Sequence, residues 1–343
     1  MSNRYPARND GQAWGQYGDP DFGYRPINIR FQSLNAEGTS LSQMNTIFPD
    51  EESCLRHVFD IRYGQGHPCL VCKRPAQWYK VPSRRYFNAR CCRNVSISPT
   101  SGSLFDHTKL PLKDWFLLML YFANSRTGVS ATLAQRLLGT SHAAAFNMCD
   151  RIRTHMALLE SRNKIGGAGE HVHVDEAQFR GILSEKSPNN RIIVLGMCTK
   201  STLISTVIPN RKQSTIIPII ESFVKKDSII VTDGHASYRS LPKYNWRTET
   251  VNHSKNIYVN SNGVSQAQIE TYWGHMKRAF RLSHLRIERH NVWKYINAFN
   301  FVYNRRLRSR DTFWDMISCF PPFSLTPVPH SGMDAEFDKE LLL

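Results

Sequence analysis

The order of strand and helix patterns after Glu170 constrains the fold more than any other feature of this sequence. Three short strand-like runs precede a helix, two further strands and two long helices, at 171–175, 191–198, 203–208, 214–225, 228–232, 248–252, 265–282 and 292–307. Strands rich in β-branched residues, mixed with helices in this way, are typical of α/β layer architectures. We therefore expect an α/β domain over residues 168–310, in which helices flank a sheet.

The charge of the chain indicates a polyanionic partner. Lysine and arginine number 44 against 28 aspartates and glutamates, which gives a formal net charge of +16. The excess is clustered, because the segment 62–95 has eight basic residues and no acidic one, and the segment 271–310 has ten basic residues and one acid. Clusters of this kind are footprints of nucleic-acid binding, although a general solubility charge is the simpler alternative.

Nothing in the sequence indicates a membrane protein. No apolar run reaches the roughly 18 residues that a membrane span needs. The longest one, 115–123, is flanked by charge and predicts a buried helix. The first 30 residues are polar and lack the apolar centre of a signal peptide. We therefore expect an intracellular protein whose residues 1–40 form a disordered leader.

Four of the eight cysteines lie close together and indicate a metal site. They are Cys69, Cys72, Cys91 and Cys92, within a segment that predicts short strands after a helix over 42–62. A Cys-x-x-Cys pair in an intracellular protein favours metal binding over a disulfide. We expect a zinc-ribbon-like module within residues 41–108, with Cys91 or His67 as the fourth ligand. Buried thiols without a metal are the alternative.

A helical region follows over residues 109–162. Ser130 is a helix cap for 131–138, Gly139 ends that helix, and a second helix spans 143–159. Two helices joined by a turn of about three residues form a helix-turn-helix pattern, in which Arg151 could reach DNA. A plain helical hairpin has the same pattern.

Three carboxylates are candidates for a magnesium site. Asp175 and Asp233 each follow a strand-like run, where ligand sites of open α/β sheets lie. If those two strands are neighbours, the two carboxylates meet; a cap or turn role is the alternative for each. Glu270 stands beside the apolar stripe of its helix, with Lys277 two turns further along nearly the same face. A solvated surface glutamate is the alternative for Glu270.

Residues 67–310 resemble the Merlin superfamily of DDE transposases and its bacterial insertion-sequence relatives, which carry an ISXO2-like transposase domain. The matching motifs are HVDEAQFRG at Asp175, VTDGHASY at Asp233, VNHS at 251–254, IETYWGHMKR at Glu270, INAFNFVYNRRLR at 296–308 and PLKDWF at 111–116. The resemblance implies a ribonuclease-H-like catalytic domain with a mixed sheet. It also implies that the three carboxylates hold two Mg²⁺ or Mn²⁺ ions, and that Zn²⁺ binds the cysteines.

Two positions depart from the pattern of that family. The family usually has a second Cys-x-x-Cys, but Ala89 stands where one of its cysteines is expected. Many relatives also have an asparagine just before the catalytic glutamate, where this chain has Ala267 and Gln268. The first departure leaves the fourth zinc ligand open between Cys91 and His67.

The resemblance implies an enzyme that cleaves DNA at the ends of a transposable element and joins the freed ends to target DNA. Its partners would be terminal inverted repeats, target duplex and a second copy of the chain, in the nucleus of a eukaryotic host or otherwise in the cytoplasm. His235 and Tyr238, which follow Asp233, could orient the scissile phosphate, with a histidine at a helix start and a packed tyrosine as the alternative. Lys277 and Arg278 are expected to contact phosphates. Residues 311–343 are expected to form a C-terminal tail.

Three other functions compete with transposition. A domesticated transposase could bind DNA without cutting it, and the irregular cysteines favour this faintly. A ribonuclease or junction-resolving nuclease could use the same catalytic core, but the zinc and helix-turn-helix parts favour sequence-specific duplex binding. A zinc-dependent transcription regulator would leave residues 170–310 unexplained.

Overall fold

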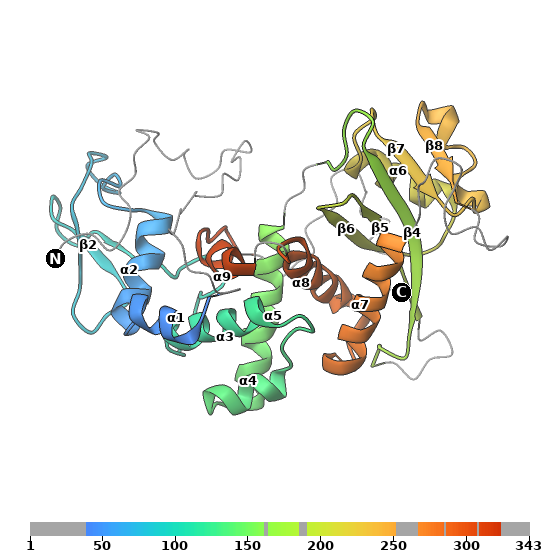
Figure 1. Cartoon of the computed structure of the whole chain (residues 1–343). Helices are drawn as coiled ribbons and strands as arrows, with labels where there is room; N and C mark the ends of the chain where they lie inside the picture. Colours follow the sequence, from blue (N-terminus) through green and yellow to red (C-terminus); the bar gives the residue numbers. More distant parts are fainter. Residues whose placement is uncertain are drawn as a thin grey trace.

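The computed structural model describes residues 39–160, 164–184, 191–251, 267–284, 286–306 and 309–323. Residues 1–38 of the predicted leader, most of the VNHS motif and most of the predicted tail lie outside these ranges. Within them, the chain forms a helical part with a small sheet and a separate sheet domain, which lie side by side in Figure 1. No helix in the described ranges is long and apolar enough to cross a membrane.

The amino-terminal end of the helical part contains two helices where one was predicted. Helices α1 (Leu41–Ile47) and α2 (Glu51–Arg62) are separated at Pro49. Asp50 caps α2, because its Oδ1 atom accepts the Ser53 N–H at 2.8 Å. The predicted single helix over 42–62 is therefore wrong, since a proline and a capping aspartate begin a new helix within it.

A three-stranded antiparallel sheet follows α2, as the short strand-like runs predicted. Its strands are β1 (Trp78–Lys80), β2 (Phe87–Ala89) and β3 (Ser96–Ile97), in the order β1-β2-β3. The buried Phe87 ring stacks on Phe59 of α2 at a centroid distance of 4.1 Å. The small sheet therefore shares the apolar core of the helices beside it.

Three helices complete the central part of the helical core. They are α3 (Leu112–Asn124), α4 (Ala131–Leu138) and α5 (His142–Leu159). Ser130 and Ser141 cap α4 and α5 through their side chains, and Gly139 ends α4 with a left-handed φ of 62°. The predicted helix, turn and helix are thus present, and α4 packs against α5.

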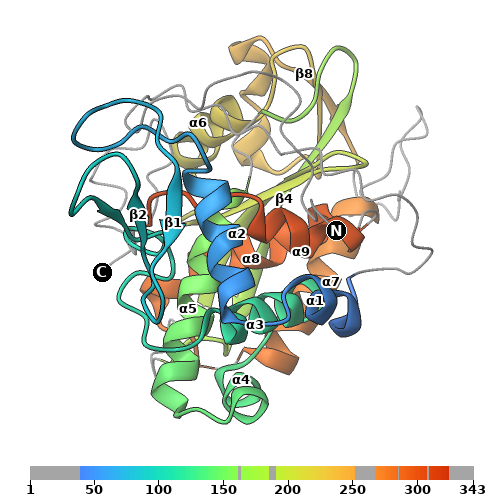
Figure 2. The ribbon, with the colours of Figure 1, turned by 90° about the vertical axis from the view of Figure 1, so that its left-hand side faces the viewer.

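Helix α9 (Ser309–Ile317) returns to this core after the sheet domain. Figure 2 shows it among the helices of the amino-terminal part. The ring nitrogens of His57 and His155 each lie 2.8 Å from one of its last carbonyls, those of Ile317 and Met316. Carbonyls in the last turn of a helix have no partner within the helix, so the two imidazoles satisfy them. Phe313, Met316 and Ile317 are buried in this core, so the predicted beginning of a C-terminal tail at residue 311 is wrong.

The sheet domain has a mixed sheet in the order β6-β5-β4-β7-β8. Strands β4 (His171–Arg180), β5 (Arg191–Cys198) and β6 (Leu203–Ile208) are antiparallel, whereas β7 (Ile229–Thr232) and β8 (Arg247–Thr250) run parallel to β4. Helix α6 (Gln213–Phe223) packs on one face of the sheet, and α7 (Ala267–Ser283) and α8 (Val292–Asn304) pack on the other. The α/β expectation is confirmed.

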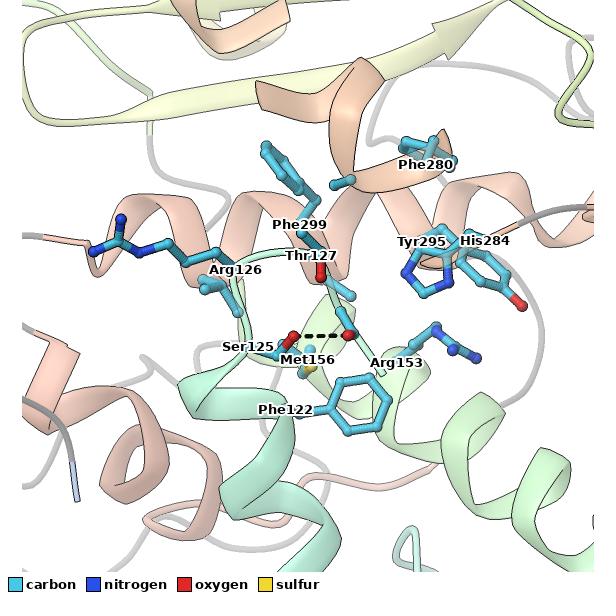
Figure 3. A pocket seen from close by; sticks show the side chains of 14 residues that line it. Phe122, Ser125, Arg126, Thr127, Arg153, Met156, Phe280, His284, Tyr295 and Phe299 are labelled. Atoms are coloured by element: carbon cyan, nitrogen blue, oxygen red, sulfur yellow. Dashed lines mark hydrogen bonds between the residues drawn. The ribbon is translucent and has the colours of Figure 1, made fainter. Parts of the chain in front are cut away.

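Charged side chains on α8 and directly after it join the helical part to the sheet domain. The Lys294 ammonium donates to both carboxylate oxygens of Asp150 at 2.8 Å, and Arg305 pairs with Glu160 at 3.0 Å. The buried Arg153 guanidinium lies 4.1 Å from the centre of the Tyr295 ring. Figure 3 shows a small pocket at this seam, where Arg153 and Tyr295 lie near His284. These contacts join α5 to α8 directly.

Candidate active site

Two of the predicted catalytic aspartates lie on neighbouring parallel strands. His173 of β4 pairs with Val231 of the parallel strand β7. Asp175 and Asp233 each lie two residues further along, so they come to the same level of the sheet. The condition set by the sequence, that these two strands be neighbours, is met. Strand β4 does not end near Asp175 as predicted but continues to Arg180. The sheet has an edge at this level because β7, and not β4, ends there.

The turn after β7 fixes the backbone at Asp233. The Asp233 Oδ1 atom accepts the His235 N–H at 2.8 Å, and Gly234 between them has a left-handed φ of 80°. A residue with a Cβ is strained at this φ, so the glycine permits the sharp turn. Asp233 itself is half-buried.

Helix α7 brings the third carboxylate over the same face of the sheet. Ile269 and Trp273 are buried against the sheet, and Glu270 lies exposed beside them. Lys277 and Arg278 are exposed further along the helix. The indole Nε1–H of Trp273 donates to the Oδ2 atom of Asp175 at 2.9 Å. The helix therefore contacts the first aspartate directly while presenting the glutamate.

The electrostatics of Asp175 favour a cationic ligand. Burial raises the pKa of its carboxyl, the Trp273 hydrogen bond lowers it, and the negative charges of Asp233 and Glu270 raise it. Those two contributions show that the three carboxylates act on one another. Hard oxygen donors of like charge are the ligands that Mg²⁺ and Mn²⁺ prefer, so the donor set fits such ions.

The spread of the three carboxylates is too wide for one ion to gather them without movement. Among the described residues, the only group of three or more such side chains whose ligand atoms all lie within 4.8 Å of one another is a group of cysteines. Carboxylates that share two ions about 4 Å apart need not meet this limit.

Glu176 is a buried acid that the sequence analysis missed. Successive residues of a strand point to opposite faces, so Glu176 faces α6 while Asp175 faces α7. Burial raises the pKa of the Glu176 carboxyl, and the nearby Tyr238 hydroxyl partly offsets this. Glu176 Oε1, Tyr238 Oη and Arg211 Nε nevertheless have no hydrogen bond of normal geometry. The alternation around Asp175 was the signal that would have assigned Glu176 to this face.

The residues predicted to contact DNA divide into accessible and inaccessible groups. His235, Lys277 and Arg278 are exposed. Tyr238 is only 3% exposed and packs in the core beside α6, so its predicted contact with the scissile phosphate is wrong.

Arg151 is occupied within the helical part. Its Nε donates to the Leu104 carbonyl at 2.6 Å, and a terminal nitrogen donates to the Ser103 carbonyl at 3.2 Å. Its guanidinium also lies 4.8 Å from the centre of the Phe323 ring. We therefore correct its predicted role in DNA binding, because these contacts turn the side chain toward the protein.

The four clustered cysteines converge on one point. Their sulfur atoms all lie within 4.8 Å of one another, and Cys72 and Cys91 are 3.6 Å apart. Tetrahedral zinc with bonds of about 2.3 Å requires sulfurs roughly 3.8 Å apart, so the spacing fits the ion. Cys91 completes this group, whereas the His67 ring packs against Tyr63 at 5.0 Å.

The Cys-x-x-Cys turn is shaped to hold a thiolate. Lys73 has a left-handed φ of 59°, and its N–H donates to the Cys69 carbonyl at 2.9 Å. Backbone N–H groups of Cys72 and Val71 point at the Cys69 sulfur and lower the pKa of its thiol to about 6. Metals bind the thiolate form, so this turn favours the metal-binding state of Cys69.

Comparison with known proteins finds a likeness over the sheet domain. Residues 167–304 match the family model of the ISXO2-like transposase domain, so this part of the chain is similar to a transposase domain of that kind. The match runs from the segment before β4 to the end of α8, and therefore contains Asp175, Asp233 and Glu270.

One relative is similar over a shorter stretch. The chain is 35% identical over 79 residues to an uncharacterized transposase-like protein of Haemophilus influenzae. The match covers 23% of this chain and 63% of that relative's length. A solved structure of Mos1 transposase, in a paired-end complex with the left transposon end, was also matched. The aligned part is 63% of this chain and 82% of that chain. Its TM-score of 0.25 and identity of 11% are too low to argue from.

Proposed function

We propose that this chain is a DDE transposase of the Merlin superfamily, with a ribonuclease-H-like catalytic domain. In this proposal Asp175, Asp233 and Glu270 hold two Mg²⁺ or Mn²⁺ ions. The parallel pairing of β4 with β7 carries the proposal, because it brings two aspartates from distant motifs to one level of the sheet. Helix α7 then adds the glutamate on the same face.

Two bound ions would activate a water or a 3′-hydroxyl and stabilise the leaving oxygen. The protein's own part is to hold carboxylates and phosphates in place. Lys277 and Arg278, exposed on the helix that carries Glu270, neutralise phosphates near the site. His235 follows Asp233 directly and is exposed, so its ring can reach a phosphate beside that carboxylate.

The amino-terminal part would recognise the element ends. The four cysteines hold Zn²⁺ in this proposal, within the basic segment that has no acidic residue between 62 and 95. The partners would be terminal inverted repeats and target duplex. Two ends must be joined, so the active form would be a homodimer. Its place would be the nucleus of a eukaryotic host, or the cytoplasm of a bacterial one.

The decisive experiment compares two glutamates in a nicking assay. Glu270→Gln removes a metal ligand and should lower Mg²⁺-dependent nicking of an inverted-repeat duplex by more than about 100-fold, since even outer partners of metal ligands are worth 10–100-fold. DNA binding should survive. Glu288→Gln makes the same change at another exposed position and should cleave like the parent. If Glu270→Gln cleaves as well as the parent, Glu270 is not a ligand, and His275 on the same helix is the next candidate.

The rival functions make different predictions in the same assay. A domesticated DNA-binding protein would bind the inverted repeat without nicking it in any metal. A ribonuclease with the same core would cleave an RNA–DNA hybrid in preference to the duplex. A transposase cleaves the inverted-repeat duplex and transfers the freed 3′ end to a second DNA.

A further inference from the structure

Trp273 connects the two elements that carry Asp175 and Glu270. It lies on α7, three residues after Glu270 and hence on nearly the same face of the helix. Its indole N–H donates to Asp175 Oδ2 at 2.9 Å, and the side chain is only 5% exposed. One side chain therefore touches the first carboxylate from the helix that presents the third.

Gly196 provides the surface on which the Trp273 ring lies. It pairs with Asp175 between β4 and β5, so it is the cross-strand neighbour of the first carboxylate. A Cβ built on Gly196 would lie 2.7 Å from Cζ2 and 2.8 Å from Cη2 of Trp273. Real Cβ atoms do not approach ring carbons so closely, so a larger residue would push the ring away. The absence of a side chain here lets α7 approach the sheet.

Neighbouring aromatic rings fix the orientation of the indole. The Tyr272 ring lies at a centroid distance of 4.7 Å from Trp273, and the Phe179 ring of β4 lies edge-on at 6.2 Å. With its Cζ2 and Cη2 atoms beside Gly196 and these rings next to it, the indole has little freedom to rotate. Its N–H is therefore directed at Asp175 by packing, before any ligand binds.

We propose that Trp273 is a positioning residue of the catalytic site: its N–H orients the Asp175 carboxylate, and its ring on Gly196 sets how far Glu270 stands from it. A carboxylate has about four acceptor directions, so the hydrogen bonds from Trp273 and from the Glu176 backbone leave others for a ligand. Partners behind a ligand group usually orient it in this way in metal sites. The inference rests on the proposed function in that Asp175 and Glu270 are taken to hold metal.

The competing explanation is that Trp273 only fills the core, and three variants of the full chain separate the two. Trp273→Phe removes the N–H together with the ring atoms over Gly196. Gly196→Ala keeps the N–H but displaces the ring. The double variant Trp273→Phe with Gly196→Ala puts a methyl group where the lost ring atoms were, so it restores packing but not the hydrogen bond.

The measurement is Mn²⁺ binding, followed by electron paramagnetic resonance on the DNA-free protein, with Tm recorded for each variant. Asp175→Asn defines the signal that belongs to this site. Each single variant should weaken that Mn²⁺ binding by about 10–100-fold. The double variant should recover the Tm lost by Trp273→Phe while its Mn²⁺ binding stays weak. In the double variant, the nicking rate at saturating Mn²⁺ should come closer to that of the parent protein than the nicking rate at low Mn²⁺.

Two results would overturn the inference alone. One is recovery of Mn²⁺ affinity together with Tm in the double variant, since packing would then account for everything. The other is unchanged Mn²⁺ affinity in Trp273→Phe. If the parent protein shows no Asp175-dependent Mn²⁺ binding, the proposed function itself fails, and the role assigned to Trp273 fails with it.

Discussion

The helical part and the sheet domain both bury polar side chains, but they do so differently. In the helical part these groups have partners: His57 and His155 reach the carbonyls of α9, and Arg153 donates to the Val129 carbonyl at 2.6 Å. In the sheet domain, burial raises the pKa of Asp175 and, on the opposite face of the sheet, that of Glu176. The charges of Asp233 and Glu270 raise the pKa of Asp175 further, so a cation bound among these three carboxylates would stabilise the charged form of Asp175.

The largest effect is expected from loss of zinc, which should unfold a segment of the helical part and leave the sheet domain folded. Cys72→Ser removes one of the four converging sulfurs, so zinc should be lost and residues 67–100 should become sensitive to protease. Structural zinc contributes about 10–16 kcal/mol in small zinc peptides, so a module this small should not keep its fold. Metal analysis gives the zinc content, and limited proteolysis locates the unfolding.

Cys319→Ser is the matched control for this prediction, because Cys319 lies outside the cysteine cluster. It should keep its zinc and its resistance to protease. An unchanged zinc content in Cys72→Ser would contradict the four-cysteine site. Early cleavage within the sheet domain would contradict the expectation that this domain is spared.

A second prediction uses pH to separate the two regions. Burial lowers the pKa of His57 and of His155 to about 4, from a usual value of 6.5. As the pH falls, the unfolded chain therefore takes up protons before the folded one. The contribution of these two histidines to the free energy of unfolding is full above about pH 6.5 and is lost as the pH falls toward 4. Each pKa unit corresponds to roughly 1.4 kcal/mol.

Asp175 and Glu176 have the opposite sign. Because their folded-state pKa values are raised, the folded sheet domain binds protons more readily than the unfolded chain, and acidification stabilises it relative to neutral pH. Calorimetry of the parent and of His155→Gln, without added Mg²⁺, checks this. The variant should lose less Tm between pH 6.5 and 4; equal losses would refute the assignment.

The smallest effect concerns DNA affinity. Lys277→Ala should weaken binding to all DNA sequences and reduce the salt slope by about one, because it removes one phosphate contact. Its Tm should not change, since the side chain is exposed. A salt series of binding assays measures the slope.

Arg151→Ala is the informative counterpart. This change removes hydrogen bonds to two backbone carbonyls, so it should lower Tm and leave the salt slope unchanged. A lower salt slope in Arg151→Ala would return this residue to the DNA surface.

Local sequence patterns were enough to predict much of the fold and of the candidate site. The strands around Asp175 and Asp233 were expected, because β-branched runs are visible locally. That the two strands are neighbours was stated only as a condition, because no local pattern records which strands pair. The length of β4 was missed, since residues up to Arg180 extend only because β5 pairs with them. Tyr238 was misassigned because its burial depends on α6 packing above it, which no local pattern records.

The contacts of α9 also have a consequence for synthesis on the ribosome. His57 reaches the carbonyl of a residue made 260 positions later, and His155 one made 161 positions later. Until Ile317 has left the ribosomal exit tunnel, the imidazoles of His57 and His155 lack these acceptors, and α9 cannot pack against the amino-terminal core. Although chains usually fold from the amino terminus onward, this one completes its first region last. The strands of the sheet domain are therefore all synthesised before the part proposed to bind the element ends can be completed.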